Sequence, residues 1–174
     1  MKRTVWIWEL FGFALTSLLG TVLHFMYEWL DKAIWIAPFS GVNESTWEHM
    51  KLLFWPMLFY TLFQSLFFRE YKSFWCVKLR GTLIGLSLIP LLFYTYNGVI
   101  GKSPDWINIA IFFVSALAVY VYETKALYTN ATPRKSQRHP FICLMIIALL
   151  FVIFTFSAPE LNVFLDPLTS TYGL

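Results

Sequence analysis

The fold is decided by residues 21–55, TVLHFMYEWLDKAIWIAPFSGVNESTWEHMKLLFW, where one long apolar segment ends and a second begins. Ionisable side chains gather at this junction, among them His24, Glu28, Glu44, Glu48, His49 and Lys51. Ionisable groups at membrane depth are costly, so they normally face a bundle interior or a wet cavity. The stretch therefore predicts two membrane helices with a polar site at their shared mouth.

The composition of the whole chain supports a membrane protein. Hydrophobic residues make up 58% of the 174 residues, aromatic residues 20% and charged residues only 13%, which is outside the usual balance of soluble domains. A bilayer core about 30 Å thick needs roughly 20 apolar residues per helix. Five segments meet this length: residues 5–30, 46–68, 76–97, 105–128 and 140–157. We therefore expect one membrane domain, residues 1–174, built as an all-α polytopic bundle of five transmembrane helices.

The basic residues predict the orientation of the bundle. Ten of the 13 Lys and Arg residues lie at the N-terminus or in and beside the second and fourth connections, and only Lys32, Lys51 and Lys102 lie on the other side. This asymmetry follows the positive-inside rule, with the N-terminus cytoplasmic and the C-terminus outside a cell membrane. The net charge of +3 is then explained by the basic residues that orient the protein in the membrane. No basic stripe indicates nucleic acid, so the expected partner is the lipid bilayer.

Polar residues recur along the first segment at helical spacing. Ser17, Thr21, His24 and Glu28 are separated by four, three and four residues, which places them on one helix face. Lipid offers such groups no hydrogen-bond partners. We therefore expect this face to point at other helices.

The second segment opens with a helix start signal. Ser45 and Glu48 fit the S/T-x-x-E capping box, and Glu44 lies at the positive end of the helix dipole. Glu44, Glu48 and Lys51 share a face, so Lys51 can pair with Glu48 or, across the hairpin, with Glu28. These structural roles and a ligand-binding role are compatible with one another.

Further polar residues lie near the same end of the bundle. Tyr94 and Asn97 end the third segment, and Asn108 lies one turn inside the fourth. The candidate ligand-binding residues are Asn43, Glu28, Glu44, Glu48, Lys51, Tyr94, Asn97 and Asn108. The amphipathic tail, residues 158–174, would lie at the outer surface as an interfacial anchor or a lid over this mouth.

The mouth also contains residue types that bind divalent metals. His24 and Glu28, four residues apart on a helix, form a two-ligand element that Glu48 could complete for an ion such as zinc. The chain has no HExxH motif. In an enzyme, His24, Glu28, Glu48 and His49 would be the catalytic candidates, with a metal-bound water as nucleophile.

Gly81 and Gly85 form a GxxxG element in the third segment. Small residues at this spacing allow another helix to approach closely. We expect this element to mediate packing within the bundle.

A motif in the junction carries a family resemblance. The string V-N-E-S-x-W-E-H-x-K at residues 42–51, with H-F-x-Y-E upstream at residues 24–28, resembles a family of small bacterial multi-pass membrane proteins of unknown function. The resemblance implies that this hairpin is the part to test.

The sequence leaves three functions open. The first is binding or transport of a small polar solute or ion at the outward-facing mouth. The second is an intramembrane metal-dependent hydrolase acting on a lipid-linked or membrane substrate. The third is a structural or accessory subunit in which the charges lock the hairpin.

Overall fold

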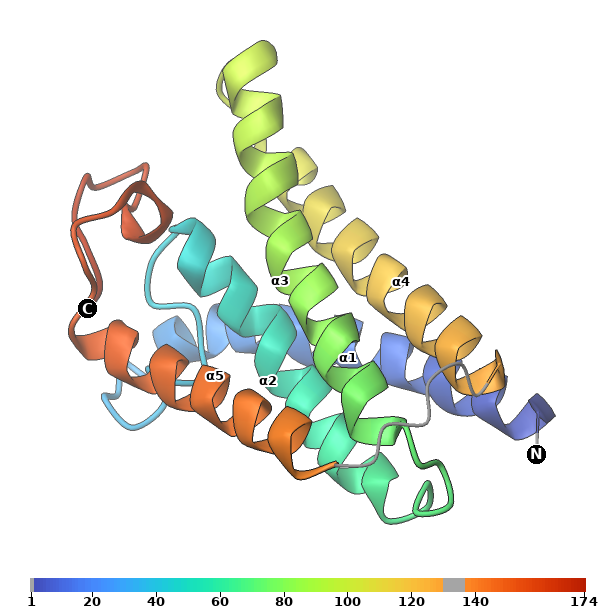
Figure 1. Ribbon diagram of the computed structural model, residues 1–174. Helices are drawn as coiled ribbons and strands as arrows, with labels where there is room; N and C mark the ends of the chain where they lie inside the picture. Colours follow the sequence, from blue (N-terminus) through green and yellow to red (C-terminus); the bar gives the residue numbers. More distant parts are fainter. Residues whose placement is uncertain (1, 130–136) are drawn as a thin grey trace.

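The structure is a computed structural model that describes residues 2–129 and 137–174 (Figure 1). The helices of this part of the chain are α1 (Lys2–Trp29), α2 (Thr46–Ser65), α3 (Phe74–Val99), α4 (Asp105–Thr129), α5 (Arg138–Phe156) and the short 3-10 helix η1 (Asn162–Phe164). The only β structure among these residues is an isolated bridge between Leu165 and Tyr172. The protein is therefore all-helical in its described part.

The helix bounds lie within three residues of those predicted. The two largest differences, three residues each, are at the start of α1 and at the end of α2. Helix α2 stops at Ser65 because the amides of Phe67 and Phe68 both donate to the Gln64 carbonyl and close a turn. Among the described residues, four helices are long and apolar enough to cross a membrane: Thr4–Trp29, Phe74–Val99, Asp105–Thr129 and Arg138–Phe156.

Helix α2 is the central helix of the bundle. Thirteen of its 20 residues are buried, and it packs against each of the other four α-helices and against η1. Figure 1 shows α3 and α4 running side by side as a hairpin and the C-terminal tail beside the start of α2. The bundle therefore has one end, here called the mouth end, at which α1, α3 and α5 finish and α2 and α4 begin.

The buried face of α1 differs from the predicted one. Thr21 and Glu28 are exposed, and the Thr21 hydroxyl donates to the Ser17 carbonyl of its own helix, which satisfies it without a neighbour. The face that packs on other helices consists of Val5, Glu9, Gly12, Thr16 and Gly20. The prediction was wrong for Thr21 and Glu28, whereas Ser17 and His24 are partly buried. The buried face differs because Gly12 and Gly20 let α1 approach its neighbours closely.

The connection between α1 and α2 folds back onto the end of α1. The Ser40 hydroxyl accepts a hydrogen bond from the Tyr27 amide (2.9 Å) and donates to the Leu23 carbonyl, so it bridges two groups four residues apart in the helix. Gly41 lies beside His24, and a Cβ at this position would be 3.7 Å from His24 Nδ1. The loop thus holds the start of α2 next to the last turns of α1.

Two lysines that entered the topology count are buried inside the bundle. Lys78 lies within α3 at 1% exposure and Lys51 within α2 at 0%. Lys78 was counted with the second connection, but it lies four residues inside α3, which begins at Phe74, and its side chain is enclosed by the bundle. Without these two residues, nine Lys and Arg residues remain on the predicted cytoplasmic side and two on the other side, so the charge asymmetry remains.

Candidate functional site

Lys51 is held by an internal network at the mouth end. Its ammonium contacts Glu48 Oε2 at 2.5 Å and donates to the Ala37 carbonyl (2.8 Å) and to Thr155 Oγ1 (3.1 Å). All three N–H groups of the ammonium are thereby used, and the loop before α2 is tied to α2 and α5. The predicted Glu48 to Lys51 pair is confirmed, and its complete satisfaction indicates a structural lock.

The predicted capping box of α2 has two hydrogen bonds, one from the Glu48 amide to Ser45 and one from the Ser45 amide to Glu48, and only the first forms. Ser45 Oγ accepts from the Glu48 amide at 3.4 Å. The Glu48 carboxylate accepts from the Val42 amide (3.0 Å), while the Ser45 amide donates to Asn43 Oδ1 (2.9 Å). The reciprocal bond is replaced because Asn43, two residues before Ser45, reaches its amide through an Asx turn.

Glu28 lies outside the mouth network. It is exposed and pairs with Lys32 at 3.4 Å, so it does not reach Lys51. The predicted metal set of His24, Glu28 and Glu48 is therefore not brought together. In the part of the chain that the structure describes, no group of three or more His, Cys, Asp or Glu side chains is arranged to hold a metal ion.

Two histidines meet at one carboxylate at the mouth. Glu44 Oε1 lies 3.8 Å from His24 Nε2, and Glu44 Oε2 lies 3.6 Å from His49 Nε2. The two imidazole rings have centroids 5.8 Å apart. His49 Nδ1 lies 2.9 Å from the Ser45 carbonyl oxygen, which only accepts, so the Nδ1 proton points there and Nε2 faces Glu44. All three side chains are partly exposed, between 21% and 41%.

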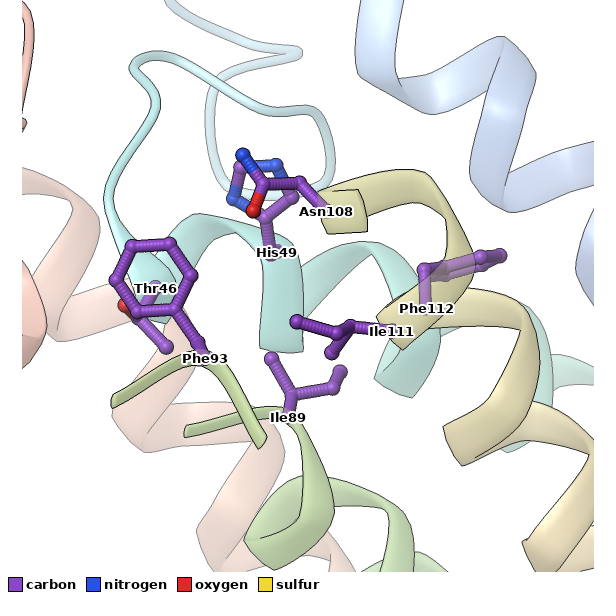
Figure 2. Close-up of a pocket in the computed structure, with 7 residues that line it drawn as sticks. All are labelled: Thr46, His49, Ile89, Phe93, Asn108, Ile111 and Phe112. Atoms are coloured by element: carbon purple, nitrogen blue, oxygen red, sulfur yellow. The ribbon is translucent and has the colours of Figure 1, made fainter. Parts of the chain in front are cut away.

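A small pocket lies between α2, α3 and α4 next to this group (Figure 2). Its lining residues are Thr46, His49, Ile89, Phe93, Asn108, Ile111 and Phe112. Four are apolar and three carry polar groups, so the wall of the pocket is mostly apolar. His49 belongs both to the pocket and to the group with His24 and Glu44.

The polar groups of the pocket keep hydrogen-bonding capacity. Asn108 Oδ1 accepts from Ser103 Oγ at 2.9 Å, which leaves the two Nδ2 protons available. Thr46 Oγ1 donates to the Tyr94 hydroxyl at 3.4 Å and keeps its acceptor capacity. Asn108 lines the pocket, and its role in ligand binding stays a prediction.

The remaining predicted ligand-binding residues hold connections in place. Asn97 Oδ1 accepts from the Ser103 amide (2.8 Å) in the turn between α3 and α4. The Tyr94 hydroxyl donates to the Asn162 carbonyl (2.9 Å), and Asn43 Nδ2 donates to the Gly173 carbonyl (2.9 Å). Both bonds fasten the C-terminal tail. Its Phe164 packs on Trp47 with ring centroids 4.6 Å apart, so the tail covers the start of α2.

A second polar cluster, which sequence reasoning missed, lies toward the opposite end of the bundle. Glu9 of α1, Gln64 of α2, Lys78 of α3 and Glu123 of α4 are each at most 1% exposed. Lys78 Nζ lies 3.1 Å from both Glu9 oxygens and 2.5 Å from Glu123 Oε2, and Gln64 Nε2 donates to Glu9 Oε1 at 2.7 Å. We call these four residues the inner cluster.

Two sequence signals could have identified the inner cluster. Glu9 and Glu123 interrupt strongly apolar segments well inside the helices, where a charge implies a partner. Gly81 marks the meeting point, because a Cβ there would collide with Glu123 Oε1. Gly85 packs α3 against Val119 of α4 and Leu53 of α2, as the GxxxG prediction expected.

The comparisons with known proteins give a family without a function. The model of DUF6512, described as a family of unknown function, matches residues 2–174, so the chain belongs to this family. Neither the search of curated proteins nor the search of solved structures found a match.

Proposed function

We propose that this DUF6512 protein is an integral membrane protein that binds or transports a small solute through the pocket at its mouth end. The observation that carries the proposal is the double position of His49, which lines the pocket and faces Glu44 together with His24. A pocket wall that is mostly apolar, with a few convergent polar groups at one side, suits a compact solute with an apolar body and one polar head.

The polar groups favour a head that donates hydrogen bonds. With its proton on Nδ1, a neutral His49 offers Nε2 as an acceptor, and the Glu44 carboxylate is an acceptor with negative charge. When both imidazoles are neutral, Glu44 is the only charge of the group. An amine is therefore the simplest head group for this site.

We further propose that five helices cross the cell membrane with the N-terminus cytoplasmic and the mouth end outside. The nine basic residues that remain at the other end support this orientation. Helix α2 would cross inside a sheath of the four more apolar helices, which explains its more polar composition. The pocket would then open to the exterior, and a solute would reach it from outside.

The test uses purified full-length protein in lipid nanodiscs and three probes with the same ring: benzylamine, benzyl alcohol and benzoate. Binding is measured by isothermal titration calorimetry. Benzylamine should bind most tightly and benzoate most weakly, because Glu44 attracts a cation and repels an anion. His49→Phe and Asn108→Leu should each weaken benzylamine binding about tenfold, which corresponds to about 1.4 kcal/mol.

The matched control is Glu28→Gln, which changes an exposed carboxylate of the same region outside the pocket. This variant should bind benzylamine like the unmodified protein. Equal affinity of the His49→Phe variant and the unmodified protein for all three probes would overturn the assignment of the pocket. Uptake of radiolabelled benzylamine into proteoliposomes then separates a transporter from a binding protein.

A further inference from the structure

The inner cluster has an uneven charge. Two carboxylates, Glu9 and Glu123, contact one ammonium, Lys78, so the fully ionised cluster carries a net charge of −1. None of these side chains is more than 1% exposed. An uncompensated charge in so dry a place costs several kcal/mol, so the cluster needs one more positive charge.

Among the side chains that the structure describes, the neighbours of Lys78 do not supply this charge. Tyr60 of α2 and Tyr120 of α4 lie with their rings 5.9 and 5.8 Å from Lys78 Nζ, and Phe74 of α3 lies at 5.7 Å. The Tyr60 hydroxyl donates to the Trp8 carbonyl (2.5 Å). The Tyr120 hydroxyl is hydrogen-bonded to Thr16 Oγ1 of α1 (2.7 Å). Each helix that packs around Lys78 therefore contributes acceptors, aromatic rings or neutral hydroxyls.

The cluster also contains two acceptors without a donor. Glu123 Oε1 and Gln64 Oε1 are buried and have no hydrogen-bond partner among the residues that the structure describes. A buried acceptor without a partner is costly, and most are satisfied in folded proteins. One added proton would balance the charge and, on Glu123 Oε1, would remove one of these unpaired acceptors.

We propose that the inner cluster is a proton-binding site in which Glu9 and Glu123 together hold one exchangeable proton beside Lys78. A proton fits the geometry better than a metal cation, because Glu123 Oε1 packs directly against Gly81 of α3. A metal ion needs several oxygen ligands around it and room to place them. Buried acid–base groups that join several transmembrane helices are typical of proton relays. The proposal does not depend on what the mouth pocket binds.

The experiment is infrared difference spectroscopy of the full-length protein in nanodiscs, in H₂O and D₂O, across a titration from neutral to alkaline pH. The carbonyl stretch of a protonated carboxylic acid should be present at neutral pH, shift in D₂O and disappear at high pH. Glu123→Gln places a neutral side chain of the same shape beside Lys78 and should abolish the band while the protein stays folded. Glu70→Gln, a change at an exposed carboxylate, should leave it intact.

A second measurement protects the test against misfolding. Labelling with dicyclohexylcarbodiimide, which reacts with protonated buried carboxyls, should modify Glu9 or Glu123 at neutral pH, as located by mass spectrometry. Absence of the band and of labelling in the folded, unmodified protein would overturn the proposal. So would sodium binding that Glu123→Gln removes, since the site would then take a cation in place of the proton.

Discussion

At the scale of single residues, the two buried lysines play different parts. Lys51 has one carboxylate and two neutral oxygen acceptors, so its surroundings are balanced in charge and in hydrogen bonds. Lys78 has two carboxylates, and one oxygen of Glu123 has no hydrogen-bond partner within residues 2–129 and 137–174. A fully satisfied buried network makes a core rigid, whereas a buried polar group without a partner is costly. The first description fits Lys51, and the second is the reason for the proton proposed beside Lys78.

The lock around Lys51 predicts a strong dependence of stability on both charges. Lys51→Met should lower the free energy of unfolding by about 3–5 kcal/mol, because it leaves Glu48 buried without its partner. The double variant Glu48→Gln, Lys51→Met should recover most of this loss. Unfolding followed by tryptophan fluorescence in detergent measures all three proteins.

Glu28→Gln is the control for this prediction. It removes one charge of an exposed pair with Lys32 and should change the free energy of unfolding by less than about 1 kcal/mol. Equal losses in Glu28→Gln and Lys51→Met would show that the lock has no special role.

At the scale of elements, the sequence predicted the helices better than their faces. Long apolar runs specify helices directly, so the bounds differ by at most three residues. The buried face of α1 was predicted from its polar stripe. Thr21 needs no neighbouring helix, however, because its hydroxyl donates to a carbonyl of α1 itself. The small residues Gly12 and Gly20, which fit against rings of α2 and α4, determine the buried face.

The candidate site was predictable only where its residues are close in the chain. The capping residue Ser45 and the Glu48 to Lys51 pair lie within one short stretch, so spacing alone indicated them. The inner cluster takes one residue from each of four helices, and no spacing connects Glu9 with Glu123. The pocket likewise depends on how α3 and α4 lie against α2, which a single sequence does not specify.

The contact of α3 with α4 gives a prediction at this scale. An alanine at Gly81 would place its Cβ 2.9 and 3.0 Å from Cγ and Cδ of Glu123, which the ion pair with Lys78 holds in place. Gly81→Ala should therefore lower the free energy of unfolding by about 1–3 kcal/mol. Thermal unfolding followed by size-exclusion chromatography measures the change.

Gly98 offers a matched control in the same helix. A Cβ at Gly98 meets nothing within 4 Å, so Gly98→Ala should be neutral or raise stability by up to about 1 kcal/mol through helix propensity. Similar behaviour of the two alanine variants would contradict the close packing of α3 on Glu123.

At the scale of the whole molecule, the pocket and the inner cluster are joined by one continuous apolar core. This core includes Ile111 and Phe112, which line the pocket, and Tyr60 and Tyr120, which surround Lys78. The two polar sites therefore lie toward opposite ends of the bundle with packed side chains between them. A solute that entered at the mouth could pass further only if these helices moved apart.

The orientation of the whole bundle is the last prediction. Basic residues near membrane helices remain cytoplasmic, so the end with nine of them should face the cytoplasm and the C-terminus should lie outside. Alkaline phosphatase, which is active only outside the cytoplasm, should be active when fused after Leu174 and inactive when fused after Lys72 in the connection between α2 and α3. Green fluorescent protein at the same two positions should give the opposite pattern. Phosphatase activity at both positions would mean that fewer helices cross than proposed, and activity at Lys72 alone would mean that the bundle is inverted and its pocket opens to the cytoplasm.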